Sequence, residues 1–509
     1  MMSDTSTFRP MPRRGAFVVA SIVAAVLVAA VSVSDAGAQR APAPGARGTR
    51  AATDTLTLTF DAAVVRALRD GEEVRAANAG VTVAEAQIGV ARSTGLPQLR
   101  LNSGYSQVVE NARANIVGAV FNQAFTYTAN AQLQQPLFLG GRVVAGAKAA
   151  NAVRGAARAS TVEVRSQVVV DVERAYLNAL FTRRLIEIQR RNLQLADQRV
   201  AQAQQLETAG RASRYDVLRL KVERANLEPD LVQAQNDYAI AVLNLRRLVN
   251  VPSEQPLALV SELDTLALQR LLLSVDTTKT SVAERSAVRA AELTRVAREA
   301  GVRVARADLL PSVTATLTSG YLALPSSNGF PASSGQTSNA FCAPGAVATR
   351  LCQNNGWFTD RNFGFQVSWP IFDGLRTRSN IENARALVDQ STVQLALVRE
   401  QVEIEAAASR AEFARARTLF DARRETVAEA NEAYELAVLR NTRGVGTVLD
   451  VSDAQLNLVR AQVNAARAIY DVFLAAAELA RATGRPIPLP DGGAMRITDR
   501  GADRVTTDR

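Results

Sequence analysis

The residue types that carry most enzymatic chemistry are scarce in this sequence of 509 residues. It has no histidine, only two cysteines, and no glycine-rich loop of the kind that cradles phosphate. Nucleophilic catalysis and metal-ion catalysis both need a constellation of side chains that this composition does not offer. The sequence therefore predicts a protein that is not an enzyme and that holds no cofactor and no metal ion.

The two cysteines, Cys342 and Cys352, stand close together in a segment rich in Gly, Ser, Asn and Pro. In an exported chain this spacing predicts a local disulfide bond, and two free thiols are the alternative.

Three aspartates stand at the start of predicted helices. Asp216 begins a helix over residues 214–249, and Asp450 and Asp453 begin another over residues 449–483. Asp450 and Asp453 are three residues apart, so both lie on one face of their helix. Acidic side chains at a helix start also stabilise the helix dipole, so a structural role is the alternative to a functional one.

A much longer helix precedes each of these helices, over about residues 142–208 and 376–441. Each carries an apolar track with a seven-residue period, and a strict seven-residue period predicts a left-handed supercoil with a neighbouring helix. At 1.5 Å per residue, ~65 residues give a rod of roughly 100 Å. The tracks are Val172, Ala179, Ile186, Leu193 and Val200 in the first helix, and Phe413, Phe420, Val427 and Tyr434 in the second.

The same plan occurs twice along the chain. A leading helix (60–92, then 282–308), two strands, a long helix and a return helix follow one another in each half. Leading and return helices together are about as long as the long helix, so stacked end to end they cover its heptad seam. We predict repeat 1 over 56–249, a linker over 250–281 and repeat 2 over 282–483.

The strands between leading and long helices alternate apolar and polar residues, which is typical of half-buried strands. Four strands alone leave open edges that lipid does not tolerate, so a membrane-inserted sheet must be closed by several chains. The polar face suits a water-filled lumen, and an ordinary soluble sheet is the alternative. The aromatic residues that could mark the membrane interfaces are Tyr105, Tyr127, Tyr321 and Trp369.

The N-terminus predicts a signal peptide over residues 1–38. Arg9, Arg13 and Arg14 precede an apolar run over residues 16–33, and Ala36-Gly37-Ala38 fits a cleavage site. An uncleaved anchor is the alternative. Residues 39–55 are predicted to be flexible, and the tail over 484–509 to be disordered.

The net charge of +10 does not indicate nucleic-acid binding. The arginines interleave with acidic residues along the predicted helices, and no basic cluster with aromatic residues occurs, so solvated helix faces explain the charge.

Taken in order, these motifs resemble the TolC-type outer-membrane efflux proteins, over about residues 55–485. The resemblance rests on the pairs Leu96-Pro97 and Leu310-Pro311, and on the segments 136–142 and 370–376. It also rests on the return-helix starts around Asp216 and Asp450, and on the offset of 234 residues between the two long helices. It implies a mainly α fold with a β-barrel part. A long coiled-coil helical tunnel joins a transmembrane barrel that is completed by trimerisation.

The resemblance further implies a passive exit duct in the outer membrane that extends into the periplasm. As a homotrimer in outer-membrane lipid, the protein would join a periplasmic adaptor and an inner-membrane pump in a tripartite efflux or type I secretion system. Relatives that export drugs, metals or proteins share the plan, so the cargo stays open. A periplasmic coiled-coil adaptor or stalk is the alternative function.

The resemblance also assigns site residues. Asp450 and Asp453, with Asp216, would form the periplasmic gate, although Asn441 and Gly446 replace a tyrosine and an arginine that hold the gate closed in the best-known relative. The turns that would dock the adaptor are Gly210, Arg211, Ala212 and Ser213 in the first half, and Gly444, Val445, Gly446 and Thr447 in the second.

Overall fold

The computed structural model describes residues 55–109, 125–252, 255–262, 268–269, 271–272, 285–323, 357–490, 494–498 and 502–505. The predicted signal peptide and both cysteines lie outside the described residues. The described residues from Leu56 onward belong to one compact unit.

The predicted helices are present with nearly the expected bounds. The first half contains α2 (Phe60–Asp70), α3 (Glu72–Ser93), α5 (Arg142–Thr208) and α6 (Arg214–Leu248). The second half contains α8 (Ser286–Arg306) with the short 3-10 turn η4 (Ala307–Leu309), α10 (Arg376–Thr442) and α11 (Val448–Thr483). Among the described residues, no helix is both long enough and apolar enough to cross a membrane.

One helix boundary was predicted wrongly, because the leading helix of the first half is broken at Gly71. The backbone of Gly71 is extended, with φ −63° and ψ 134°, and its N–H donates to the carbonyl of Ala67 at 2.9 Å. A Cβ at this position would lie 2.2 Å from the Ala67 carbonyl oxygen, so the chain passes too close for any side chain. The break lets α2 and α3 follow different directions.

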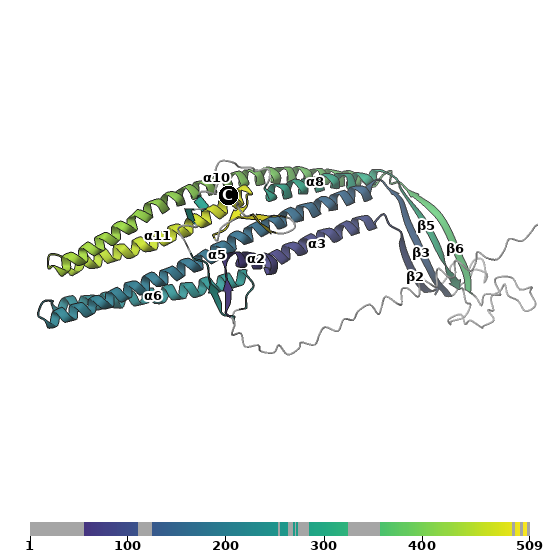
Figure 1. Ribbon diagram of the computed structural model, residues 1–509. Coiled ribbons are helices and arrows are strands. Elements are labelled where there is room, and N and C mark those ends of the chain that lie inside the picture. Colours follow the sequence, from purple (N-terminus) through teal and green to yellow (C-terminus); the bar gives the residue numbers. More distant parts are fainter. Residues whose placement is uncertain are drawn as a thin grey trace, which may run out of the picture. The chain divides into compact units, whose positions relative to one another are not determined.

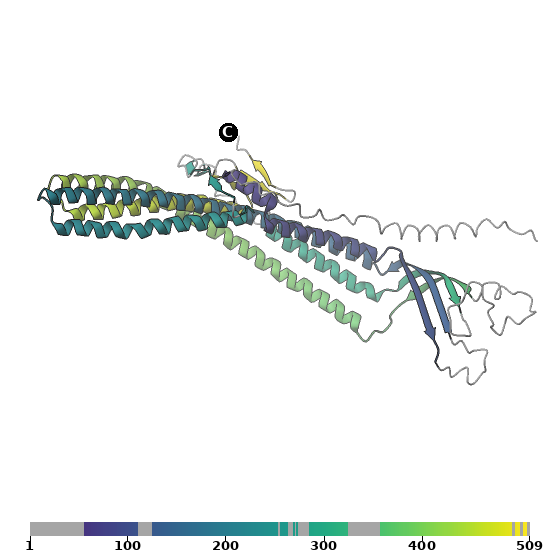
Figure 2. The ribbon, with the colours of Figure 1, turned by 90° about the horizontal axis from the view of Figure 1, so that it is seen from below.

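Four helices form one layer, and two of them continue beyond it into helical hairpins. α3, α5, α8 and α10 pack in this order, α6 returns along α5, and α11 returns along α10 (Figure 1). The α5/α6 and α10/α11 turns lie at one end and the strands at the other, as the second view also shows (Figure 2). α11 also contacts α5, which joins the two hairpins.

The strands form a four-stranded antiparallel sheet in the order β2-β3-β5-β6. Its members are β2 (Gln98–Gln107), β3 (Phe125–Leu139), β5 (Ser312–Ala323) and β6 (Trp357–Ser368). The register aligns equivalent side chains across all four strands, so that Leu99, Leu133, Leu317 and Phe363 form one row. The predicted alternation of apolar and polar faces is thus continuous across the sheet.

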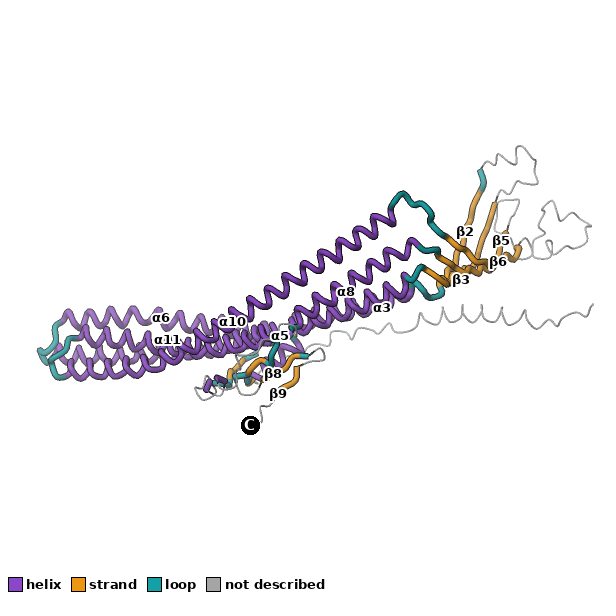
Figure 3. Tube along the Cα trace, turned by 90° about the horizontal axis from the view of Figure 1, so that it is seen from above, coloured by secondary structure: helices purple, strands orange, loops and turns teal. Residues whose placement is uncertain are grey.

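Small strands cover α5 near its middle. β1 (Leu56–Leu58) pairs in parallel with β4 (Leu257–Leu259), and β7 (Ile487–Pro488), β8 (Ala494–Ile497) and β9 (Ala502–Val505) form a three-stranded sheet (Figure 3). The prediction of a disordered tail over 484–509 was therefore wrong for these segments. Ile487, Leu489 and Met495 are buried in the main core, and this burial outweighs the polar, Pro- and Gly-rich composition of the tail.

Candidate functional site

The turn of the first hairpin is closed by backbone hydrogen bonds and a capping box. Gly210 has φ +73°, and the N–H groups of Arg211 and Ala212 both donate to the carbonyl of Leu206. The Ser213 hydroxyl accepts the Asp216 N–H at 3.1 Å, while the Asp216 carboxylate accepts the Ser213 N–H at 3.3 Å. These reciprocal bonds define the start of α6.

The second hairpin repeats this turn. Gly444 has φ +76°, and the Thr447 hydroxyl and the Asp450 carboxylate form the same capping box at the start of α11. The Asp450 carboxylate accepts the Thr447 N–H at 2.9 Å, and this bond to the charged form lowers the pKa of Asp450 below its usual value. Asn441, which stands where the relative has its tyrosine, donates to the Gly446 carbonyl at 3.1 Å and so closes its own turn.

The three predicted gate aspartates lie at the hairpin end of the molecule, but their local roles differ. Asp216 and Asp450 are capping residues, which is the structural alternative considered above. Asp453 is exposed one turn further along α11 and takes no part in the capping box. Helix capping therefore explains the positions of Asp216 and Asp450 but not that of Asp453.

A polar network that the sequence analysis missed joins the two hairpins near their tips. The Arg199 guanidinium of α5 donates to the Ser452 hydroxyl of α11 at 3.1 Å, and this hydroxyl donates to the Glu223 carboxylate of α6 at 3.0 Å. Burial lowers the pKa of Arg199, although the nearby Glu223 carboxylate opposes this effect. Gln455 of α11 also donates to the Asn192 side chain of α5. These residues lie in different helices, so no local spacing marks them.

A second network, which we name the charge knot, holds the middle of the molecule. Glu163 of α5 and Glu405 of α10 both pair with Arg285, at 2.6 and 3.2 Å, and with Arg481 of α11. The Arg285 side chain is 4% exposed, so its charge is satisfied inside the protein. Burial alone would raise the pKa of Glu163, but hydrogen bonds from Arg285 and Ser286 outweigh it and lower that pKa.

The apolar face of the sheet is open in the single chain. Exposed residues on it include Leu101 at 74% and Phe365 at 64%, and Tyr105 contacts Tyr127 with ring centroids 5.0 Å apart. Trp369 follows the helix-side end of β6, where its indole N–H donates to the Leu309 carbonyl at 3.2 Å. Tyr321 lies near the other end of the sheet. It pairs with Thr359 of β6, which is ten residues before Trp369 in the chain.

This separation agrees with the thickness of a membrane. Ten residues span roughly 33 Å along a strand, and a tilt of ~40° reduces this to a height of about 25 Å, which is the height of the apolar band on outer-membrane barrels. The assignment of these aromatic residues to the two interfaces stays a prediction.

The comparisons with known proteins agree with this architecture. The family model "Outer membrane efflux protein" matches residues 63–251 and 278–485, one match in each half. The outer membrane efflux protein BepC of Brucella suis is 23% identical, over 84% of this chain and 86% of its own length. The cobalt-zinc-cadmium resistance protein CzcC of Cupriavidus metallidurans is 25% identical, over 71% of this chain and 78% of its own.

The fold is also that of a solved channel. The CmeC outer membrane channel of Campylobacter jejuni superimposes with a TM-score of 0.69 at 15% identity, and the match covers 84% of this chain and 85% of that one. The family match spans most of the described helices and strands, and the two matched segments correspond to the two structural repeats. The chain therefore belongs to the outer membrane efflux protein family.

Proposed function

We propose that three copies of this chain form the outer-membrane exit duct of a tripartite efflux or type I secretion system. In this proposal the twelve strands close into one barrel, and the helical layers close into one tunnel in the periplasm. The duct is passive and catalyses no reaction, because an inner-membrane pump supplies the energy. The outer-membrane location follows from the family, and the signal peptide stays a prediction.

The observation that carries this proposal is the pair of free sheet edges. β2 and β6 are the edge strands, and they run in opposite directions because three antiparallel pairings separate them. The β6 edge of one copy can therefore pair antiparallel with the β2 edge of the next, and so on around a ring. Lipid cannot satisfy the free N–H and C=O groups of an open edge, so ring closure satisfies both edges at once.

The helical layer has matching free edges. α3 and α10 lie at its two sides, and both expose apolar side chains, such as Val90 at 67% and Val393 at 60%. These surfaces would be buried against the neighbouring copies in a closed tunnel. The periplasmic adaptor would dock at the hairpin turns, at the end away from the strands.

The experiment is chemical cross-linking of the protein in native envelopes, followed by single-channel recording of the purified product. We expect a cross-linked trimer that resists SDS until it is heated, and a conductance in planar bilayers. A folded monomer that stays in solution without detergent and gives no conductance would refute the duct and would favour the adaptor or stalk function.

The gate is tested separately. In a threefold assembly, Asp453 and Asp450 would form two rings of three carboxylates, which attract cations in a narrow constriction. We expect Asp453→Asn to reduce the cation selectivity and the block by multivalent cations more than Asp450→Asn does, because the Asp450 carboxylate is engaged by Thr447. Bilayer recordings that show the same selectivity and block in wild type and the double variant would leave both residues with helix-capping or surface roles only.

A further inference from the structure

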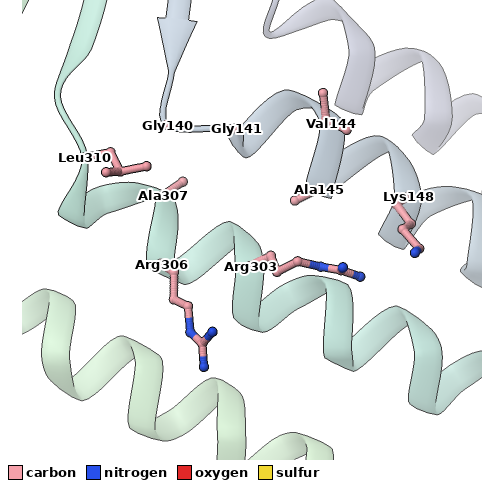
Figure 4. Close-up of a pocket in the computed structure, with 9 residues that line it drawn as sticks. All are labelled: Gly140, Gly141, Val144, Ala145, Lys148, Arg303, Arg306, Ala307 and Leu310. Atoms are coloured by element: carbon pink, nitrogen blue, oxygen red, sulfur yellow. The ribbon is translucent and has the colours of Figure 1, made fainter.

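A pocket of about 380 Å³ lies where β3 passes into α5 and where α8 passes into β5. Lys148 of α5 and Arg303 of α8 are directed into the space between the two helices, and Arg306 extends from the other side of α8 (Figure 4). Gly141, Val144 and Leu310 also line the pocket. We name this pocket the junction pocket.

The junction pocket carries positive charge without a matching acid. In the described part of the chain, no ion pair joins Lys148, Arg303 or Arg306 to an acidic side chain, whereas the adjacent Arg142 pairs with Asp308. α5 begins at this pocket after Gly141, with no side-chain cap and no acidic residue in its first turn. The helix dipole therefore adds to the positive potential, which suits an anion.

One of the lining residues, Val144, identifies a face of the helical layer. Val144 at the rim of the pocket and Arg165 are three heptads apart, so they share one face of α5 in the supercoil. The Arg165 guanidinium donates to the Thr498 carbonyl at 3.0 Å, so the C-terminal sheet lies on this face. In the proposed tunnel a sheet on the inner face would obstruct the bore, so this face would be the outer one. α5 and α8 are the middle helices of the layer, so the pocket is away from the edges that meet neighbouring copies.

In the proposed duct, the pocket would lie at the level of a membrane surface. The connections between strands and long helices expose apolar side chains, with Phe138 at 45% just before the pocket residue Gly140, and Ile371 at 89% and Phe372 at 81% in the connection between β6 and α10. Trp369 lies at the same end of the sheet. In outer-membrane barrels, such aromatic and apolar residues mark the transition from acyl chains to headgroups. In that arrangement a basic pocket just below the transition would face the lipid phosphates.

We propose that the junction pocket binds the phosphate of a phospholipid in the inner leaflet of the outer membrane. The phosphate lies between Lys148 and Arg303, at the N-terminus of α5, and the glycerol and the first acyl carbons contact Val144 and Leu310. The orientation toward the membrane rests on the proposed duct. The pocket itself is formed within one chain, so its binding is measurable whatever the oligomeric state.

The internal repeat provides a comparison for this site. The long helices are offset by 234 residues, so Glu382 stands where the first half has Lys148. The Leu-Pro motifs are offset by 214 residues, so Gly89 corresponds to Arg303. Glu382 pairs with Arg378 on its own helix. By the same offset Arg306 corresponds to Arg92, so only the two basic residues directed into the pocket, Lys148 and Arg303, lack a basic counterpart in the other repeat.

The test is native mass spectrometry of purified, delipidated protein titrated with dioleoyl phosphatidylglycerol, with glycerol 1-phosphate and with inorganic phosphate. The variant is Lys148→Ser with Arg303→Ser. The matched control is Lys221→Ser with Arg289→Ser, which removes the same charges from exposed positions outside the pocket. We expect one lipid per chain at saturation, at least a tenfold loss of lipid affinity in the variant, and no change in the control.

Each remaining outcome is decisive. Equal lipid affinity in the variant and the wild type, or an equal loss in the control, would overturn the proposal. So would binding of inorganic phosphate and glycerol 1-phosphate with the same affinity as the lipid, because the pocket would then be a site for a free anion. Cross-linking of the same samples reports the trimer separately, so a failure of the proposed duct is recognised independently of lipid binding.

Discussion

The carboxyl group of Glu173 is buried in the core of this protein. It lies in α5 with 0% exposure, and neither of its oxygens has a hydrogen-bond partner among the described residues. Burial, and secondarily the charge of Glu478, raise the pKa of Glu173 well above its usual value. The side chain is therefore protonated where exposed glutamates are charged, and it behaves as a neutral polar group in an apolar surrounding.

We predict that Glu173→Gln stabilises the protein at pH 8 relative to wild type and changes its stability little at pH 4. The folded-state pKa lies above the unfolded value, so wild type loses stability as the pH rises from the unfolded pKa to the folded one. A neutral amide of the same shape removes this dependence. Thermal unfolding followed by circular dichroism at both pH values measures it. Glu187→Gln at an exposed pair is the control, and equal shifts in both variants would contradict the prediction.

Neither Glu173 nor Arg199 could be identified from the sequence. Both are charged residues within long helices that carry many Arg and Glu residues at solvated positions, so their types and spacing resemble those of their exposed neighbours. Their burial depends on which helices meet α5 at that height, and a single sequence does not contain this information. Asp216 and Asp450 are the opposite case, because the capping pattern is local and could be predicted from a segment of four residues.

At the scale of elements, the charge knot joins α5, α10 and α11 to the start of α8. We predict that Glu163→Gln destabilises the protein by about 3 kcal/mol, because it leaves the buried Arg285 with one partner fewer. The lowered pKa of Glu163 also means that its contribution is complete above the unfolded pKa and is lost as the pH falls. As the pH falls, the free energy of unfolding should therefore decrease less in the variant than in wild type.

The control for this prediction is Glu292→Gln, which breaks the exposed pair with Arg399 at 2.6 Å. Exposed pairs contribute about 0–1 kcal/mol, so the unfolding midpoint should fall much less. Denaturation of the purified protein in detergent compares the two variants. If both variants lower the unfolding midpoint equally, the charge knot contributes no more to stability than an exposed ion pair does.

The hairpin turns carry the second prediction at this scale. We predict that Gly444→Leu or Gly210→Leu abolishes export while the trimer still forms, because a bulky side chain at the tip prevents close approach of the adaptor. A Cβ at either glycine meets no atom within 4 Å, so the side chain would project outward, although the positive φ adds strain.

The matched control is Gly374→Leu. Gly374 has φ +70° and the same open surroundings, but it stands at the strand end of α10, so it adds equal strain at the wrong end. Export assays in cells compare the three variants. Normal export in both tip variants, or loss of export in the control alone, would exclude the turns as the docking site.

The element boundaries show how far sequence periodicity reaches. The long helices were predicted over 142–208 and 376–441, and the structure gives Arg142–Thr208 and Arg376–Thr442. Turns that contain a glycine with positive φ stand at both ends of each long helix, which is why the agreement is close. The break at Gly71 depends on a tight backbone contact, and the C-terminal strands depend on a core supplied by distant segments. Local sequence patterns could predict neither the break nor the C-terminal strands.

At the scale of the whole molecule, the family resemblance fixed the architecture more firmly than the site. The motifs recur in the same order, with the Leu-Pro motifs offset by 214 residues and the long helices by 234, so two copies of one plan could be predicted from one sequence. The junction pocket could not, because Lys148 and Arg303 are 155 residues apart and meet only when the two repeats pack. The two free edges of the sheet were expected from the strand number, and their opposite directions emerged from the pairing.

The pairing of β3 with β5 has a further consequence, which concerns the order of folding. Tyr127 pairs with Ala323 across 196 residues of chain, whereas α5 with α6 and α10 with α11 are joined by short turns. Proteins dominated by contacts of low sequence separation fold orders of magnitude faster than proteins dominated by distant ones. We therefore expect the hairpins to fold first and the sheet to form last, after the second repeat has been synthesised. Pulsed hydrogen exchange during refolding would show helix amides protected before strand amides, and simultaneous protection would contradict this order. A newly exported chain would then carry its unpaired strand segments through the periplasm for a period set by topology, and this interval is when binding by chaperones can prevent its aggregation.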